Sequence, residues 1–187
     1  MIRRQLLPAV LMLVTMTVIT GFAYPLVVTG IAQTVWPDRA DGSLLYREGD
    51  AVGSRLIGQS FDENRFFHPR PSAVEYDPTS SGGSNLGPTS TELGTLVAER
   101  AAAYRVRNGL VADAPVPVDA ITASASGLDP DISIANARLQ AGRVADARGM
   151  DVAEIERLIH DLAQPRSWLS EPRVNVLELN LALEGMR

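Results

Sequence analysis

A glycine-rich stretch from Ser81 to Thr89 has the residue spacing that most resembles a site for chemistry. Its glycines match the spacing of a phosphate-binding loop, with Thr89 in the metal-binding position and a predicted helix after it. Pro88 stands where such loops have an essential lysine, and proline also removes one backbone N–H that would contact phosphate. The pattern favours a tight turn leading into a helix. It leaves open a nucleotide-associated loop made of Ser81, Gly82, Gly83, Ser84, Asn85, Gly87 and Thr89.

Two serines lie where a predicted strand leads into a turn, a setting that can suit a nucleophile. Ser124 and Ser126 have two aspartates close behind them in the sequence. A catalytic triad also needs a histidine, and the chain has only His68 and His160. No G-x-S-x-G elbow is present. The pattern favours surface or edge positions for both histidines, and a membrane-tethered periplasmic serine hydrolase stays as an alternative function.

Metal binding has equally little support in the sequence. Asp129, Asp131 and Ser133 imitate the start of a calcium loop, but Ile134 and Gln140 occupy the positions that need glycine and glutamate. We expect Asp129 to be the N-cap of a helix instead. The chain also has no cysteine and no lysine, which excludes disulfides, thiolate metal sites and Schiff-base chemistry. We therefore predict no metal site and no catalytic residue.

One long apolar segment organises the chain. Residues 6–32 are apolar almost without interruption, which is long enough for a transmembrane helix of about 20 residues. Pro25 lies well inside this run and is expected to kink or interrupt the helix. A cleaved signal peptide is the alternative, but its apolar region is only about 7–15 residues long. The sequence thus favours a retained membrane anchor.

Charge predicts the orientation of this anchor. Arg3 and Arg4 precede the apolar run, so residues 1–5 are expected to be cytoplasmic. The remainder has 15 arginines against 22 acidic residues, a net charge of −7, and is expected to be periplasmic or extracellular. An acidic domain of this kind does not suit nucleic acid.

The outer part is predicted to be one α+β (mixed α/β) domain over residues 51–187, joined to the membrane by a linker at 33–50. Residues 51–67 have a strand-like composition, and 72–88 form a long Gly/Ser/Pro-rich loop. Helices are expected at 89–108, with Thr89 and Glu92 as a capping box, at 129–148 and at 151–162. Strands are expected at 116–125 and, because its leucines alternate, at 173–183. Arg138, Arg143 and Arg148 spiral round the second helix and are predicted to be solvated or interface residues.

Six motifs resemble one known family, the C subunit of the Kdp potassium-transporting ATPase. They occur in the family's order and, with the N-terminal span, cover nearly the whole chain. The family's stretch has histidine where this chain has Asp131, and usually asparagine in place of Ser90. The motifs are GSRLIGQSF at 53–61, RPSA at 70–73, YDPTSSGGSNLGPT at 76–89, DAITASASGLDP at 119–130, RVADARG at 143–149 and EPRVNVLELNL at 171–181.

The resemblance implies an accessory subunit that is not itself an enzyme. Its partners would be a potassium-channel-like subunit, a P-type ATPase subunit and the lipid bilayer of the inner membrane. It is implied to raise the ATP affinity of the ATPase subunit as a catalytic chaperone, with no cofactor bound directly; a free-standing ligand-binding module is a further alternative. The family-motif or interface candidates are Gln59, Arg70, Asp77, Asp119, Ser124, Ser126, Asp129, Arg143, Arg148, Glu171, Arg173 and Asn175.

Overall fold

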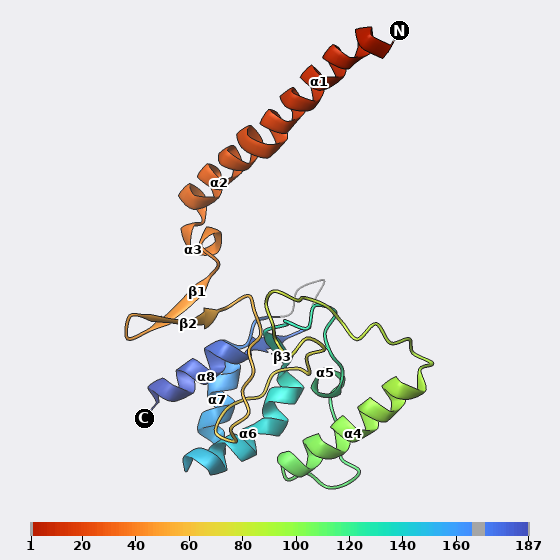
Figure 1. The fold of residues 1–187 in the computed structure, drawn as a ribbon. Helices are drawn as coiled ribbons and strands as arrows, with labels where there is room; N and C mark the ends of the chain where they lie inside the picture. Colours follow the sequence, from red (N-terminus) through yellow and green to blue (C-terminus); the bar gives the residue numbers. More distant parts are fainter. Residues whose placement is uncertain (1, 166–170, 187) are drawn as a thin grey trace. The chain divides into compact units, whose positions relative to one another are not determined.

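The chain forms two compact units. A computed structural model describes residues 2–165 and 171–186. The first unit comprises Met1–Leu44 and the second Leu45–Arg187. The first is helical, whereas the second combines helices with two small sheets (Figure 1). The prediction of one apolar helix followed by a mixed helix-and-sheet domain is therefore confirmed.

The first unit contains the helix predicted to span a membrane. It consists of α1 (Ile2–Val18), a π-helical turn (Ile19–Ala23) and α2 (Tyr24–Val35), followed by the short α3 (Pro37–Ala40). Arg4–Val35 is long and apolar enough to cross a bilayer, and none of its most apolar stretch is buried in the protein. The turn widens just before Pro25, which has no N–H and whose ring crowds the carbonyl four residues earlier. The predicted interruption is therefore a π-helical turn.

A small two-stranded sheet opens the second unit. It pairs β1 (Leu44–Arg47) with β2 (Asp50–Ser54). The two connecting residues, Glu48 and Gly49, both have positive φ angles, as the tight turns of two-residue hairpins require. The first strand falls inside the segment predicted to be a linker.

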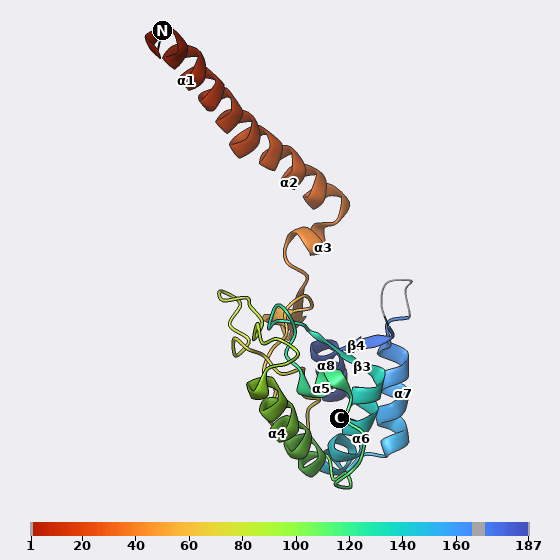
Figure 2. The ribbon, with the colours of Figure 1, turned by 90° about the vertical axis from the view of Figure 1, so that its right-hand side faces the viewer.

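The core of the second unit is built from three helices and a second small sheet (Figure 2). The helices are α6 (Ile134–Arg148), α7 (Val152–Leu162) and α8 (Val176–Gly185), and the antiparallel sheet pairs β3 (Asp131–Ser133) with β4 (Arg173–Asn175). Apolar side chains from these elements bury one another. The cluster is Phe67, Ile132, Ala137, Ala141, Val144, Ala145, Ile155, Ile159, Val174, Val176, Leu179 and Leu183.

Each strand of this sheet runs directly into a helix, which corrects two predictions. Ser133 ends β3 and caps α6 by accepting from the Asn136 N–H, so the predicted cap at Asp129 is wrong. Asn175 ends β4 and caps α8 by accepting from the Glu178 N–H, so the predicted strand at 173–183 is wrong beyond Asn175. Leucine is a good helix former, and the residue types after Asn175 favour a helix over the strand that their alternation suggested.

The caps of the other helices agree more closely with the sequence. Asp151 caps α7 as predicted, by accepting from the Ala153 N–H. Gly149 ends α6 with a positive φ of 66°, a conformation that suits glycine. Helix α4 (Thr91–Arg107) begins one residue later than predicted, because Ser90 rather than Thr89 is its N-cap.

The predicted strand at 116–125 is absent from the structure of this stretch. Its place is taken by irregular chain and the four-residue helix α5 (Val118–Ile121). Pro117 precedes this helix, and proline cannot donate a hydrogen bond to a sheet. The β-branched residues of this stretch favour a strand, but its prolines prevent the strand from forming.

Residues 55–90 contain no helix or strand, so the strand-like prediction for 55–67 is also wrong. The segment nevertheless has regular hydrogen-bond partners where it lies on the core. The Asn180 amide accepts from Phe67 N (2.8 Å) and donates to Phe67 O (3.0 Å). The Gln140 amide does the same for His68, at 2.7 and 3.0 Å. Two side-chain amides thus replace a neighbouring strand.

Replacement of Asn180 by alanine tests this arrangement. Asn180→Ala leaves the buried N–H and C=O of Phe67 without partners, and is expected to lower the free energy of unfolding by about 2–4 kcal/mol. Asn64→Ala is the matched control, since that exposed amide has no side-chain hydrogen bond in the described structure, and we expect a change within about 0.5 kcal/mol. Urea unfolding of the detergent-solubilised chain measures both. Equal stabilities would contradict the proposed role of Asn180.

Candidate functional site

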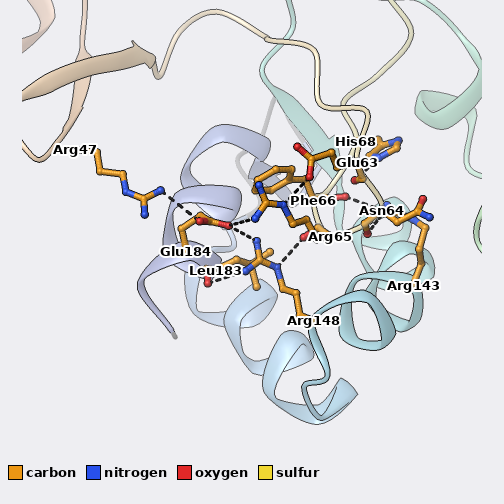
Figure 3. Close-up of polar contacts among 10 residues, drawn as sticks. All are labelled: Arg47, Glu63, Asn64, Arg65, Phe66, His68, Arg143, Arg148, Leu183 and Glu184. Carbon is orange, nitrogen blue, oxygen red and sulfur yellow. Dashed lines mark hydrogen bonds and ion pairs between the residues drawn. The ribbon is translucent and has the colours of Figure 1, made fainter.

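Two arginines of α6 hold the irregular segment on the core (Figure 3). Arg143 donates to the carbonyls of Asn64 and Phe66 through Nη1, and also to the side chains of Asn108 and Gln140. Only 8% of Arg143 is exposed. The prediction of a solvated or interface side chain is therefore wrong for Arg143, because its donors satisfy buried carbonyls.

Arg148 makes a second attachment one and a half turns further along α6. It donates to the carbonyls of Arg65 and Leu183, and it pairs with Glu184 at 2.8 Å. The side chain of Arg148 is only 4% exposed, so the prediction of a solvated or interface side chain is wrong for Arg148 as well. Figure 3 shows Glu184 at the centre of this group, with further contacts to Arg47 and Arg65.

An aromatic ring fills the space between these charges. The guanidinium carbons of Arg65 and Arg148 lie 4.6 and 5.4 Å from the centroid of the Phe66 ring. Such cation–π contacts favour arginine, whose flat guanidinium is weakly hydrated. The arrangement therefore fixes the segment through both polar and aromatic contacts.

The predicted nucleotide-associated loop packs against residues 124–127. Gly82 N donates to Ser126 O (2.8 Å), and the Ser81 hydroxyl donates to the same carbonyl (3.1 Å). Gly127 has a φ of 68°, and a Cβ there would lie 2.7 Å from Gly82 O, so only glycine allows this close approach. Gly83 lies almost as close to Ala125. The glycines of the two motifs therefore serve to bring their backbones together.

Other members of this loop are exposed. Asn85 has a positive φ of 55°, and the loop ends before the α4 cap at Ser90. Thr89 consequently lies outside the helix. The exposed members of the predicted loop are Ser81, Ser84, Asn85, Gly87 and Thr89.

Asp77 closes a small turn beside this loop. Its Oδ1 accepts from both the hydroxyl (2.7 Å) and the N–H (2.9 Å) of Thr79. These two hydrogen bonds lower the pKa of Asp77. The carboxylate therefore has a local turn-forming role.

The structure does not bring the candidate nucleophiles to a histidine within the described residues. Within the described chain, the Ser124 hydroxyl bonds to the hydroxyl of Ser126, at 3.4 Å, and the Ser126 hydroxyl accepts from Leu128 N. His68 contacts Glu63 O and Arg107, whereas His160 is exposed beside Asp161. This geometry contains no serine–histidine pair.

Several predicted residues, from segments far apart in the sequence, converge at the β3–β4 sheet. A hollow of about 220 Å³ is lined by Arg70, Asp119, Asp129, Glu171 and Arg173 together with Asp131. Two ion pairs of 2.7 Å cross it, Arg70 with Asp129 and Arg173 with Asp131. Burial raises the pKa of Asp131, although nearby Arg173 opposes that shift. The described residues hold no group of three or more side chains suited to a metal ion.

The remaining predicted residues here make structural contacts. Asp119 accepts from the N–H and hydroxyl of Ser133 and from the Asn136 amide. Asn175, besides capping α8, donates to Arg55 O and Asp131. Gln59 fills the space that Gly53 leaves, since a Cβ on Gly53 would lie 1.8 Å from Gln59 Nε2.

Sequence reasoning missed the polar residues of the core itself. Asn136, Gln140 and Asn180 are each at most 2% exposed. Asn136 accepts a hydrogen bond from a tyrosine hydroxyl, and the other two amides donate to backbone carbonyls of the irregular segment. Asn136 and Gln140 are four residues apart on the buried face of α6. An amide at a core-facing helical position is the signal that would have found them.

The chain matches one family of known proteins over nearly its whole length. A family model described as "K+-transporting ATPase, c chain" matches residues 6–185. The chain belongs to the KdpC family.

Individual relatives agree with the KdpC assignment. A potassium-transporting ATPase KdpC subunit of Mycobacterium tuberculosis (strain H37Rv) is 55% identical, over 98% of this chain and all of the relative. KdpC subunits of Cereibacter sphaeroides (strain ATCC 17029) and Beijerinckia indica are 53% and 52% identical. The first comparison covers 97% of both chains, and the second covers 95% of this chain and 92% of the relative. The resemblance drawn from the six motifs is thus confirmed.

The environment of His68 predicts a pH dependence for the KdpC fold. Burial lowers the pKa of His68 to about 4, with the charges of Arg143 and Arg107 adding to the shift. The unfolded chain, with an ordinary pKa of 6.5, binds a proton that the folded chain excludes. Stability is therefore lost as the pH falls from about 6.5 towards 4.

His68→Asn tests this dependence. Between pH 7.5 and 4.5 the variant is expected to lose about 2–3 kcal/mol less unfolding free energy than the original chain. His160→Asn, at an exposed position, is the control and should keep the original dependence. Urea titrations at the two pH values measure the difference. An unchanged slope in His68→Asn would refute the role of burial.

Proposed function

We propose that this KdpC-family chain is a non-catalytic accessory subunit needed for assembly and stability of an ATP-driven potassium uptake complex. Its partners in this proposal are a potassium-channel-like subunit and a P-type ATPase subunit, as the resemblance implies. The observation that supports it most is that the polar residues of the family motifs bond to the chain itself. Arg143, Arg148, Asp119 and Asn175 all position backbone or neighbouring side chains. A domain held by such internal bonds is expected to be rigid, as suits a subunit that binds others in a complex.

The location we propose is the inner membrane, with one helix crossing it and the folded domain outside the cytoplasm. Arg4–Val35 has the required length and apolar character. Arg3 and Arg4 precede the span, and cytoplasmic flanks are the ones enriched in arginine and lysine. Thr20 and Thr34 each donate their hydroxyl to a backbone carbonyl four residues earlier, at 2.7 Å, which satisfies these polar groups in lipid.

For the catalytic-chaperone role, we infer that an effect on ATP affinity passes through the assembled complex. An extracytoplasmic domain does not meet cytoplasmic ATP. Binding of this subunit would instead favour the conformation of the ATPase subunit that binds ATP more tightly. The packing of Gly82 against Ser126 supports this view, because that N–H already has a protein acceptor.

Co-purification tests the accessory role. The chain is tagged at its C-terminus and solubilised in mild detergent from potassium-starved cells. We expect stoichiometric recovery of a channel-like subunit and a P-type ATPase subunit. Recovery of the chain alone, while both subunits are present and intact, would refute the proposal. Labelling by a serine-reactive probe would then favour a hydrolase, and binding of a small ligand without partners would favour a binding module.

Cysteine labelling tests the orientation, and the absence of native cysteine makes the background negligible. Val111→Cys introduces a thiol at a side chain that is 70% exposed, and Gln5→Cys introduces one ahead of the span. In spheroplasts, a membrane-impermeant maleimide is expected to label Val111→Cys at once and Gln5→Cys only after permeabilisation. The opposite order would place the domain in the cytoplasm. A mature mass lacking residue 5 would instead indicate a cleaved signal peptide.

A further inference from the structure

A second hollow of about 290 Å³ is lined by the irregular segment, α4 and α6. Arg100, Ala103, Tyr104 and Arg107 contribute to its wall. These four residues are spaced three, four and seven apart and therefore share one face of α4. Figure 2 shows α4 at one edge of the domain, with α5 between it and α6 in this view.

The arginines of this hollow differ from most others in the domain. Among the described residues, neither Arg100 nor Arg107 has a carboxylate within 4.0 Å, and Arg143 beneath them has none either. Among the other described arginines of the second unit, Arg105, Arg138 and Arg157 also lack an acid within 4.0 Å, whereas six are paired with acids: Arg47, Arg55, Arg65, Arg70, Arg148 and Arg173. The hollow thus has two lining cations, Arg100 and Arg107, whose charge no carboxylate of the described chain neutralises within 4.0 Å, in a domain with an excess of acidic residues.

His68 orients Arg107 without neutralising it. Arg107 Nη1 lies 3.2 Å from His68 Nδ1, and His68 Nε2 lies 3.0 Å from Glu63 O. A neutral ring protonated on Nε2 satisfies both contacts, because Nδ1 then accepts from Arg107. The ring thereby holds the guanidinium with one of its five donors. Its other donors have no acceptor among the described residues.

Arg100 is held in the same manner. It donates through Nη1 to Ile121 O, at 3.2 Å, and this is its one hydrogen bond to the described chain. Below the hollow, Arg143 bonds to Asn108 and Gln140, both of which line it. Positive charge is therefore fixed on the wall and under the floor before any ligand arrives.

The other lining groups define the kind of anion that fits. Phe61, Pro69 and Pro71 give the hollow an apolar side, which suits an organic group. Asp62 is the lining residue that is negatively charged, and its carboxylate is exposed and bonded to Ser60. Its repulsion disfavours ligands with several negative charges, such as phosphates. A singly charged, planar carboxylate matches the fork of an arginine.

We propose that this hollow binds a carboxylate group on an organic ligand, with Arg107 and Arg100 as its cationic donors. The carboxylate has two possible sources, a free organic acid or an acidic side chain of a partner subunit. The first source needs only this chain. The second rests on the accessory role proposed above.

Binding by the full chain in detergent tests the first source. Benzoate is the probe, and benzamide is its neutral counterpart of the same shape. We expect saturable binding of benzoate and at least about tenfold weaker binding of benzamide. Arg107→Gln and Arg100→Gln should each weaken benzoate binding about tenfold or more. Arg138→Gln, which removes an exposed arginine elsewhere on α6, is the matched control and should leave it unchanged.

Salt-dependent co-purification tests the second source. Once the original chain is known to retain its partners, complexes with Arg107→Gln or Arg100→Gln should release them at lower NaCl than the complex with Arg138→Gln. Melting temperatures confirm that each variant is folded. If partners are never recovered with the original chain, benzoate binding alone decides. Equal binding of benzoate and benzamide overturns the proposal. So does the absence of any variant effect in both experiments.

Discussion

The fold depends on satisfying the backbone of residues 64–68, the part of the irregular segment 55–90 that lies on the core. A buried N–H or C=O without a partner costs about 1–3 kcal/mol, so such a segment needs acceptors and donors from elsewhere. Here the side-chain amides of Asn180 and Gln140 replace a neighbouring strand for residues 67 and 68. Arg143 and Arg148 donate to the carbonyls of residues 66 and 65 just before them. The helices α6 and α8 therefore act as a template for the irregular chain, in addition to forming the apolar core.

This constraint explains why arginine serves so many structural roles. A guanidinium has five donors in a fixed plane, whereas a lysine ammonium is a single point charge. Arg148 can therefore bond two carbonyls and a carboxylate at once while packing on Phe66. By the same measure, Arg100 and Arg107 of α4 are different, since each uses only one donor in a bond to the described chain. An arginine whose donors already have acceptors within the fold has a structural role, whereas one with free donors can bind a ligand.

The predicted site residues fall into groups that the family motifs alone did not reveal. Arg70, Asp129, Asp131 and Arg173 form two ion pairs at the β3–β4 sheet, and the glycines of 82–83 and 127 allow two loops to touch. These contacts join motifs that are 40 or more residues apart in the sequence. A domain held together in this way presents a fixed surface, which is what a subunit of a larger membrane complex needs.

By itself, the sequence determined the apolar helix, its interruption near Pro25, the helix α7 with its Asp151 cap, and membership of the KdpC family. These depend on local composition, on spacing within one helix, or on motif order. Only the tertiary structure decided the rest. The alternating leucines after Asn175 fit either a strand or a helix. The structural role of a buried amide such as Asn180 becomes visible only when the distant segment that it bonds, here at Phe67, lies beside it. Likewise, Arg143 and Arg107 are the same residue type, and only the surrounding chain decides that the donors of Arg143 bond carbonyls and amides while Arg107 contacts a single ring nitrogen. Such pairings join distant segments, so local sequence patterns do not encode them.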